Sequence, residues 1–249
     1  SREDLYLNRH PKVGVLSHSG KFLIDLSNDF FHQEWKDWHQ IIHQRNSKKI
    51  ENISAQSSES LSMINPMKLC TILDGHLQEG DILIADGGDF VAIASYILQP
   101  RSLNGWLDPG VFGTLGVGAG FILGAKLTHP DSIVWAIYGD GAFGYSLMEF
   151  DTFVRHKIPV IAVIGNDASW AQIARDQVDI LDDDISTKLA ATDYHKAVEA
   201  LGGKGYIIEN EKDIDSILNE AKVSALNGFS VAVNVRIGKS EFRKGSISI

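Results

Sequence analysis

Two apolar runs, each followed by oxygen-bearing side chains, constrain the fold of this chain more than any other feature. The first run is IVWAIY at residues 133–138, and the second is PVIAVIG at residues 159–165. Both are rich in β-branched residues, which is typical of strands buried on both faces of a parallel sheet. A turn with two glycines and a predicted helix at residues 145–156 separate them. This order predicts a βαβ unit.

Polar residues follow both predicted strands. Gly139-Asp140-Gly141 comes directly after the first strand, and Asn166-Asp167 comes after the second. Because the carboxyl ends of parallel strands meet at one edge of a sheet, where open α/β sheets bind ligands, we expect these residues to form a site. Backbone N–H groups at the glycine turn can receive a diphosphate, and the two aspartates can hold a hard cation such as Mg²⁺.

The remaining pattern alternates helices with strands and predicts an α/β fold, with a doubly wound, mainly parallel sheet and helices on both faces. The acidic stretch at residues 176–184 is expected to form a loop. The other predicted elements are helices at residues 67–77, 91–97, 193–201 and 212–226, a helix that ends near residue 127, a strand that begins at residue 81, and strands at residues 205–209 and 229–237.

The distance from Gly-Asp-Gly to Asn-Asp resembles the cofactor motif of the thiamine-diphosphate enzymes, which runs from Gly-Asp-Gly to Asn-Asn. DILIADGGDF at residues 81–90 and GVFGTLGVGAGFILGAKL at residues 110–127 resemble the earlier segments of the same cofactor domain, in the same order. GDGAFGYSLMEFDTFVRHKIPVIAVIGNDASW and the terminal VNVRIGKSEFRKGSISI are similar to the acetolactate synthase-like group, which includes the 2-hydroxyacyl-CoA lyases. The resemblance covers residues 62–249.

The resemblance implies that thiamine diphosphate is bound through Mg²⁺. Asp140, Asp167 and the backbone carbonyl of Ser169 would be the metal ligands. Family members usually have Asn where this chain has Asp167, so this site would carry a second anionic ligand. Such a ligand can tighten Mg²⁺ binding or favour Mn²⁺, and it can also repel the diphosphate. Asn166 is expected to orient the loop rather than to bind metal.

Leu115 matches the large apolar residue that, in this family, holds the cofactor in a bent shape. The pyrimidine amino group then lies next to the thiazolium C2, whose deprotonation generates the reactive carbon. The alternative is an ordinary core leucine after a glycine turn. Trp170 and Gln172 are the candidates to face the substrate, and a core role for Trp170 is the alternative. The resemblance implies the following cofactor contacts: Gly88, Asp89, Gly113, Thr114, Leu115, Gly139, Asp140, Gly141, Ala142 and Trp170.

Several other kinds of site are disfavoured by the sequence. GTLGVGAG at residues 113–120 resembles a dinucleotide-binding loop, but no clear strand precedes it and no acidic residue ends a second strand at the expected distance. A formal net charge of −9 argues against nucleic-acid binding. The single cysteine, Cys70, excludes an intrachain disulfide and a multi-thiolate zinc site. No apolar run has the length of a transmembrane helix.

Three segments are predicted from the organisation of the chain. Residues 1–45 contain a strand-like KVGVL and a helix-like KFLIDLSNDFF, and resemble the end of a preceding central α/β domain. The polar, serine-rich residues 46–61 are interpreted as an exposed linker, and residues 62–249 as the C-terminal thiamine-diphosphate domain. We therefore expect a C-terminal portion of a longer intracellular protein. This portion is expected to be soluble, and members of the family can be anchored to the endoplasmic reticulum through the absent N-terminal part.

Three functions are compatible with this interpretation. The first is a lyase that cleaves 2-hydroxyacyl-CoA to an aldehyde and formyl-CoA, the second an acetolactate synthase-type transferase acting on 2-keto acids, and the third a non-catalytic cofactor-binding or oligomerisation module. In this family the activating glutamate comes from the N-terminal domain of another subunit, so no catalytic residue is assigned here and at least a homodimer is expected. Flavin (FAD) is common in acetolactate synthases, but nothing in this chain predicts its site.

Overall fold

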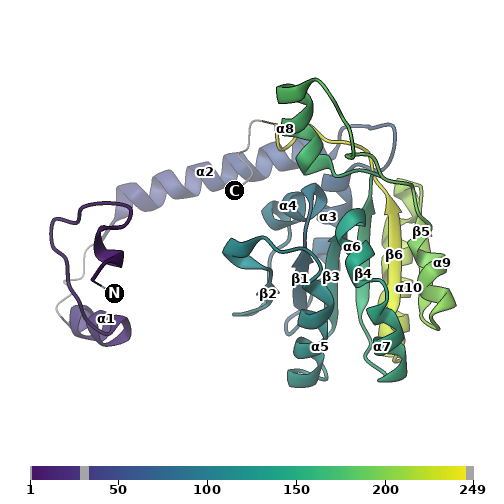
Figure 1. The fold of residues 1–249 in the computed structure, drawn as a ribbon, viewed down its shortest axis with the longest axis horizontal. Coiled ribbons are helices and arrows are strands. Elements are labelled where there is room, and N and C mark those ends of the chain that lie inside the picture. The colour runs from purple at the N-terminus through teal and green to yellow at the C-terminus, as the bar shows by residue number, and fades with distance from the viewer. Residues whose placement is uncertain (1, 29–33, 245–249) are drawn as a thin grey trace. The chain divides into compact units, whose positions relative to one another are not determined.

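The computed structural model describes residues 2–28 and 34–244. The chain divides into two compact units, Ser1–Lys48 and Lys49–Ile249. The described part of the first unit contains a short 3₁₀ helix, η1 (Asp4–Tyr6), the helix α1 (Ser19–Asn28) and the beginning of α2 (Lys36–Ser57). The second unit carries the sheet and the predicted site, and is the α/β body in Figure 1.

The second unit is built on a six-stranded sheet in which every neighbouring pair of strands is parallel. The strand order is β2-β1-β3-β4-β6-β5, so the predicted βαβ strands, β3 and β4, are neighbours near the centre. Gly139 pairs with Gly165 in the register, which brings the residues that follow both strands to the same edge. The strands are β1 (Ile82–Asp86), β2 (Trp106–Leu107), β3 (Val134–Gly139), β4 (Ile161–Asn166), β5 (Lys204–Ile208) and β6 (Val231–Arg236).

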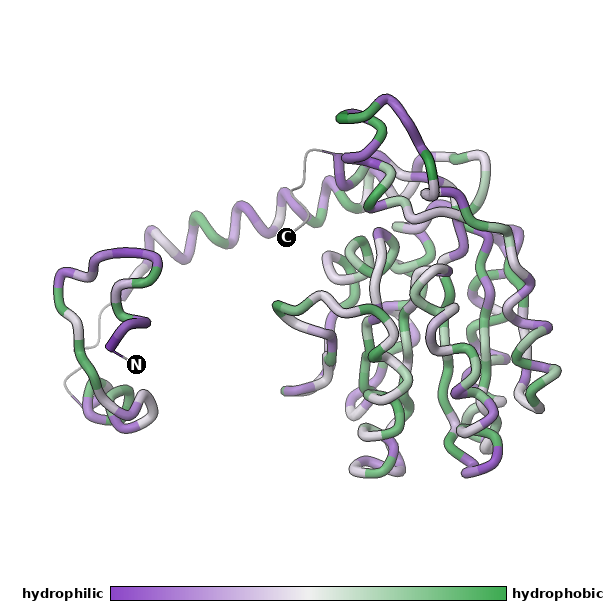
Figure 2. The backbone as a smooth tube through the Cα atoms, viewed as in Figure 1, coloured by the Kyte–Doolittle hydropathy of each residue, from purple (hydrophilic) through white to green (hydrophobic). Residues whose placement is uncertain are grey.

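Helices cover both faces of this sheet, as the sequence predicted. On one face, α3, α4 and α10 pack on a buried apolar cluster, and on the other α5, α6, α7 and α9 pack on a second cluster. The central strands are largely hydrophobic along their length (Figure 2). This is because their side chains alternate between the two buried clusters. The helices are α3 (Pro66–His76), α4 (Asp89–Ile97), α5 (Gly118–Thr128), α6 (Asp140–Ser146), α7 (Glu149–Arg155), α8 (Ala171–Leu181), α9 (Tyr194–Ala200) and α10 (Ile214–Leu226), with the short 3₁₀ helices η2 (Gly110–Phe112) and η3 (Glu211–Asp213).

The N-terminal segments differ from the sequence prediction. KVGVL forms no strand in the structure, and α1 accounts for the start of the helix-like segment that follows it. The end of that helix-like segment, residues 29–31, lies outside the described residues. Residues 46–57 were interpreted as a linker without regular structure but continue α2. Their helix is stabilised within the second unit, because Ile53 packs against the apolar cluster and the Lys49 ammonium lies 5.4 Å from the Tyr96 ring centroid.

Three further elements correct the prediction within the second unit. The helix expected at residues 145–156 begins earlier, at Asp140, and is interrupted between α6 and α7. The acidic stretch expected as a loop is helical as far as Leu181, because it forms the second half of α8. β2 was not predicted, since two residues carry no detectable alternation. Among the described helices, none is both long enough and apolar enough to cross a membrane.

Candidate functional site

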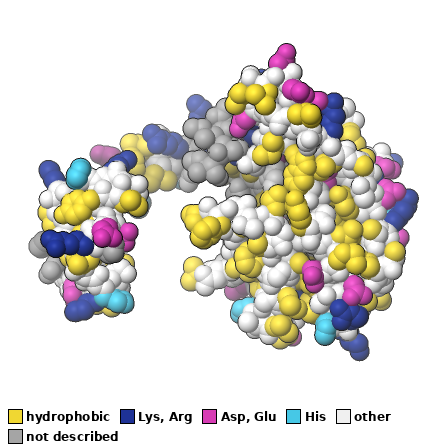
Figure 3. Space-filling model, viewed as in Figure 1, with side chains coloured by type: hydrophobic (Ala, Val, Ile, Leu, Met, Phe, Trp, Pro, Cys, Tyr) yellow, Lys and Arg dark blue, Asp and Glu magenta, His cyan; other side chains and the backbone are white. Residues whose placement is uncertain are grey.

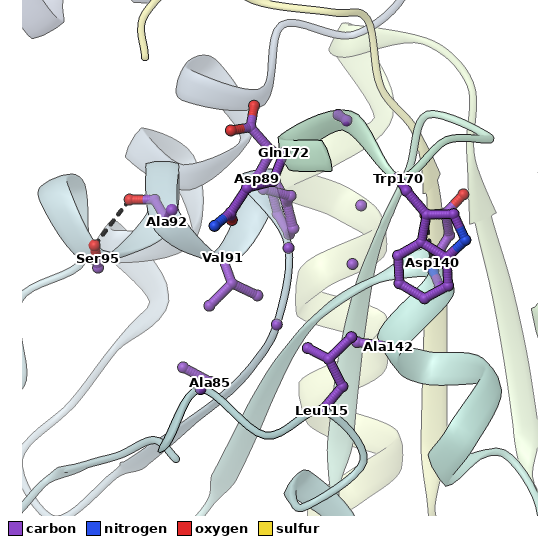
Figure 4. Close-up of a pocket in the computed structure, with 18 of the residues that line it drawn as sticks. Ala85, Asp89, Val91, Ala92, Ser95, Leu115, Asp140, Ala142, Trp170 and Gln172 are labelled. Carbon is purple, nitrogen blue, oxygen red and sulfur yellow. Dashed lines mark hydrogen bonds between the residues drawn. The ribbon is translucent and has the colours of Figure 1, made fainter. Parts of the chain in front are cut away.

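A cavity of about 530 Å³ lies at the carboxyl ends of β1, β3 and β4. Figure 4 shows Leu115 and Ala142 together on one wall, with Asp89 and Gln172 across the cavity from Trp170 and Asp140. Thr114 is exposed and does not line the cavity. The other predicted site residues all line it: Gly88, Asp89, Gly113, Leu115, Gly139, Asp140, Gly141, Ala142, Asp167, Ser169, Trp170 and Gln172.

Asp140 is the first residue of α6 and is 2% exposed. Its Oδ1 accepts a hydrogen bond from the Gly141 N–H at 2.8 Å, whereas Oδ2 is buried and finds no hydrogen-bond partner in the described part of the chain. Burial, followed by the nearby Asp167 carboxylate, raises the pKa of Asp140 to about 6. A buried carboxylate oxygen without a partner is costly in a protein alone, and a cation would remove that cost.

Asp167 follows β4 and lines the same cavity. Its Oδ1 accepts a hydrogen bond from the Ser169 N–H at 3.1 Å, which closes a tight turn around Ala168, whose φ is 54°. Burial raises the pKa of Asp167 as well. Both carboxylates are partly desolvated, which disfavours their ionised forms. A hard divalent cation favours the ionised forms, and carboxylate oxygens are the donors that it requires.

Asn166, by contrast, does not line the cavity. Its side-chain amide donates to the Thr192 carbonyl at 3.0 Å and to Asn234 Oδ1 at 3.1 Å, so it ties the end of β4 to β6 and to the segment before α9. Within residues 2–28 and 34–244, no group of three or more His, Cys, Asp or Glu side chains is arranged to hold a metal. A cation here would therefore rest on two carboxylates and main-chain oxygens.

Leu115 reaches the cavity from the glycine-rich loop before α5. It contacts the turn after β1 so closely that a Cβ on Gly87 would lie 2.0 Å from Leu115 Cδ2 and 3.1 Å from Ala142 Cβ. Gly113 and Gly116, on either side of Leu115, have φ values of 58° and 85°, which favour glycine. The loop conformation thus directs one large apolar side chain to the cavity wall.

Trp170 is half-buried and its indole lies against the start of α6. A Cβ on Gly141 would come within 2.4 Å of the ring, so only glycine permits this contact. Gln172, near the start of α8, is also half-buried and faces the same cavity. The space that a Cβ would need at Gly87 and Gly141 is already filled by Leu115 and Trp170, so these glycines let the two large side chains pack against the backbone of the cavity wall.

The family profile described as thiamine pyrophosphate enzyme, C-terminal TPP binding domain, matches residues 86–233. The chain belongs to this family. Its region of match begins at the end of β1 and includes every residue that carries the cavity geometry described above. The residues fit the group that this family binds, because the cavity combines an unpartnered carboxylate oxygen, a second carboxylate and a lining that includes several glycines.

Curated relatives span a much greater length than this chain. It is 44% identical over 257 residues to 2-hydroxyacyl-CoA lyase 2 of Homo sapiens, a match covering 100% of this chain and 41% of that protein. Identity to the protein of the same name in Caenorhabditis elegans is 47% over 220 residues, covering 86% of this chain and 34% of the relative. Acetolactate synthase large subunit IlvG of Mycobacterium tuberculosis is 35% identical over 173 residues, or 69% of this chain and 31% of that protein.

A solved structure supports the fold independently. The thiamine diphosphate-dependent 4-hydroxybenzoylformate decarboxylase of Rhodococcus jostii RHA1 superposes with a TM-score of 0.66 at 19% sequence identity, over 74% of this chain and 34% of that chain. At this identity the similarity concerns the fold alone. The open parallel sheet with helices on both faces is therefore the fold of a thiamine-diphosphate enzyme domain.

Asp89 has a structural environment that sequence reasoning missed. It lines the cavity at the start of α4, but its Oδ1 is paired with Arg175 of α8 and lies 3.4 Å from Arg243 Nη1 of the C-terminal segment. The carboxylate is therefore largely engaged by two cations from other elements. A cofactor contact of Asp89 stays a prediction, and the ion pairs give this residue a clear role in holding α8 and residue 243 near the cavity rim.

Asp86 was also not identified from the sequence. It is the last residue of β1, is fully buried and accepts hydrogen bonds from two backbone N–H groups of the Leu115 loop. The only sequence signal was an acidic residue at the end of an otherwise apolar strand, ILIAD. Such a residue must be either compensated in the interior or functional, because an isolated buried carboxylate is strongly disfavoured.

Proposed function

We propose that this chain is the C-terminal cofactor-binding part of a thiamine-diphosphate- and Mg²⁺-dependent lyase that cleaves 2-hydroxyacyl-CoA to an aldehyde and formyl-CoA. The observation that carries the choice of substrate is the 44–47% identity to relatives named 2-hydroxyacyl-CoA lyase 2. In this reaction the bond between C1 and C2 of the acyl group breaks, C2 becomes the aldehyde carbon, and C1 takes up a proton to give formyl-CoA.

In the proposed site, Asp140, Asp167 and the Ser169 carbonyl hold Mg²⁺. The buried, unpartnered Oδ2 of Asp140 supports this role, because it lacks the hydrogen bond that a purely structural carboxylate would have. The second carboxylate, where the family usually has an amide, makes the metal–diphosphate complex less positive. Backbone N–H groups of Gly141 and Ala142, at the start of α6, are proposed to face the diphosphate.

Leu115 is proposed to support the bent cofactor from the wall that it forms with Ala142. When bound, thiamine diphosphate supplies a carbon nucleophile and an electron sink for breaking carbon–carbon bonds. Trp170 and Gln172 are proposed to face the substrate and to limit access of water, since both are half-buried and line the cavity. The remaining proposed contacts are Gly88, Asp89, Gly113, Thr114 and Gly139.

We also propose that the protein is at least a homodimer. Hydrophobic side chains are exposed over much of the α/β body on the face seen in Figure 3. Val111 is 99% exposed, Phe112 87%, and Tyr145 and Met148 66% each. Large apolar residues this exposed are typical of a surface that is covered in an assembly. An intracellular location and membrane anchoring through another part of the full-length protein stay predictions.

An acetolactate synthase-type transferase is the second candidate, and the identity of 35% to the mycobacterial synthase subunit supports it less strongly. The two functions share the cofactor site and differ in what the rest of the pocket accepts. A pure oligomerisation module would not need the buried carboxylate pair of Asp140 and Asp167, whereas a non-catalytic cofactor-binding module would hold the metal through the same pair. The relatives named as lyases and synthases argue against that last candidate.

Product analysis tests the proposal. The full-length protein, loaded with thiamine diphosphate and Mg²⁺, is offered a long-chain 2-hydroxyacyl-CoA and, separately, pyruvate, and products are identified by mass spectrometry. Aldehyde plus formyl-CoA is expected with wild type and with Asp151→Asn, a control on α7 whose carboxylate pairs with its neighbour Arg155. Asp140→Asn should give no product. Acetolactate from pyruvate would replace the lyase with the synthase, and no turnover of either substrate by the loaded protein would refute both.

A further inference from the structure

Asp86 ties the end of β1 to the Leu115 loop and does not line the cofactor cavity. Its Oδ1 accepts a hydrogen bond from the Gly116 N–H at 3.0 Å, and its Oδ2 accepts one from the Gly118 N–H at 2.8 Å. The two donors, Gly116 and Gly118, lie on either side of Val117 and just after Leu115. The carboxylate therefore holds the main chain in place immediately after that leucine. These residues are some thirty positions further along the sequence, and no local rule links them to β1.

The orientation of Asp86 follows from strand geometry. Its chain neighbours Ala85 and Gly87 line the cavity. Side chains alternate along a strand, so Asp86 lies on the same side as Ile84, which packs in the cluster beneath α5. There it is fully buried, and burial raises the pKa of its carboxyl while the two N–H groups oppose that rise. The carboxylate is thus fixed in the interior and directed at the start of α5.

Gly87 links this anchor to the cavity wall. It follows Asp86 directly and contacts the Leu115 side chain so closely that a Cβ would lie 2.0 Å from Cδ2. The same turn of the chain therefore holds Leu115 twice, by its following backbone through Asp86 and by its side chain against Gly87. The loop needs such a restraint, because glycines on both sides of Leu115 make its free conformation highly variable.

We propose that Asp86 is a positioning residue that fixes where the Leu115 side chain lies against the bound cofactor. Through Leu115 it would set how closely the reactive carbon of thiamine diphosphate approaches the pyrimidine amino group. Asp86 touches neither the metal nor the diphosphate in this assignment and acts only through the Leu115 loop. The inference deepens the proposed function and rests on the role of Leu115 given there.

The experiment uses the full-length protein saturated with thiamine diphosphate and Mg²⁺. It measures the rate at which the C2 proton of the bound cofactor exchanges with deuterium, and separately the dissociation constant of the cofactor from quenching of tryptophan fluorescence. Asp86→Asn places an amide N–H₂ or a weaker acceptor against the two N–H donors. It should slow C2 exchange at least tenfold while changing the dissociation constant less than threefold.

A matched control lies at the other end of the same strand. Asp81, 6% exposed, accepts hydrogen bonds from the Gln78 N–H and from Trp135 Nε1 at 3.0 and 3.1 Å, but lies far from the Leu115 loop along β1. Asp81→Asn therefore changes a second buried carboxylate that accepts two hydrogen bonds, both of them at Oδ2. It should leave C2 exchange within twofold of wild type. Slowing by the same factor in both variants would show a general loss of structure and overturn the inference.

A double-mutant comparison separates the inference from the function on which it rests. Leu115→Ala alone should slow C2 exchange, and adding Asp86→Asn to it should slow exchange less than twofold further, because Asp86 acts through Leu115. No effect of Leu115→Ala would refute the leucine assignment and this inference together. Two results would refute this inference alone. One is slow C2 exchange in Leu115→Ala together with wild-type exchange in Asp86→Asn. The other is a double variant in which the two single slowing factors multiply. If Asp86→Asn does not fold, Asp86→Glu replaces it. The glutamate keeps the charge and displaces the loop, and unchanged C2 exchange in that variant would likewise refute the inference.

Discussion

Asp140→Asn should make the protein more stable without its cofactor and unable to bind the cofactor through a metal. The pKa of Asp140 is raised from 3.8 to about 6 in the folded protein, first by burial and then by the Asp167 carboxylate. The native state therefore holds its proton between these pH values while the unfolded chain releases it, and the stability of the native state falls as pH rises through this window. This shift of the Asp140 pKa lowers the free energy of unfolding by at most about 3 kcal/mol, and the full loss is reached above about pH 6.5.

An amide at this position is neutral at every pH, so the advantage of the variant should depend on pH. We expect Asp140→Asn to be more stable than wild type by about 1–3 kcal/mol at pH 7.5, and close to wild type near pH 4, where both side chains are neutral. Urea denaturation of the full-length protein in EDTA, followed by tryptophan fluorescence at both pH values, measures this difference. Thiamine diphosphate with Mg²⁺ should then raise the midpoint of wild type only. A variant less stable than wild type at pH 7.5, or still stabilised by the cofactor, would refute the reasoning.

Three further predictions concern the same cavity. Asp167→Asn removes one cause of the high Asp140 pKa. In wild type, Mg²⁺-dependent cofactor binding should be lost as pH falls through about 6, and in the variant this loss should shift to lower pH. Fluorescence titrations of cofactor binding from pH 5 to 8 measure this pH profile, and an unchanged profile would contradict the coupling. Gly87→Ala should cost about 1–3 kcal/mol of stability and weaken cofactor binding, because Gly87 has φ 68° and a Cβ there would lie 2.0 Å from Leu115 Cδ2. Gly124→Ala is the control, because Gly124 lies in open space on α5. It should be neutral or slightly stabilising in the same denaturation experiment. Chelation of Mg²⁺ should abolish the rise in melting temperature that thiamine diphosphate produces, and a rise that persists in EDTA would show binding without the metal.

The sequence predicted the parts of the site that local patterns determine. Two apolar runs specified β3 and β4, and parallel strands necessarily bring their carboxyl ends together, so the residue pattern alone was enough to place Asp140 and Asp167 in one site. Leu115 was found by resemblance, and the structure adds the contact with Gly87 that explains its direction.

The remaining features depend on contacts between distant segments. Asp86 shows no periodicity, and its function depends on N–H groups that only the folded loop brings near. The second half of α2 is polar and was interpreted as a linker, but packing of Ile53 stabilises it as a helix. The acidic end of α8 was expected as a loop, because the ion pair between Arg175 and Asp89 cannot be inferred from spacing along the chain.

The position of the metal is the most direct test of the whole account. Crystals of the full-length protein grown with thiamine diphosphate and Mn²⁺ in place of Mg²⁺ would locate the cation by anomalous scattering. We predict a single peak in this cavity within bonding distance of Asp140 and Asp167 carboxylate oxygens and of the cofactor diphosphate. A diphosphate bound in the cavity without a cation at Asp140, or a cation bound elsewhere in the protein, would contradict it.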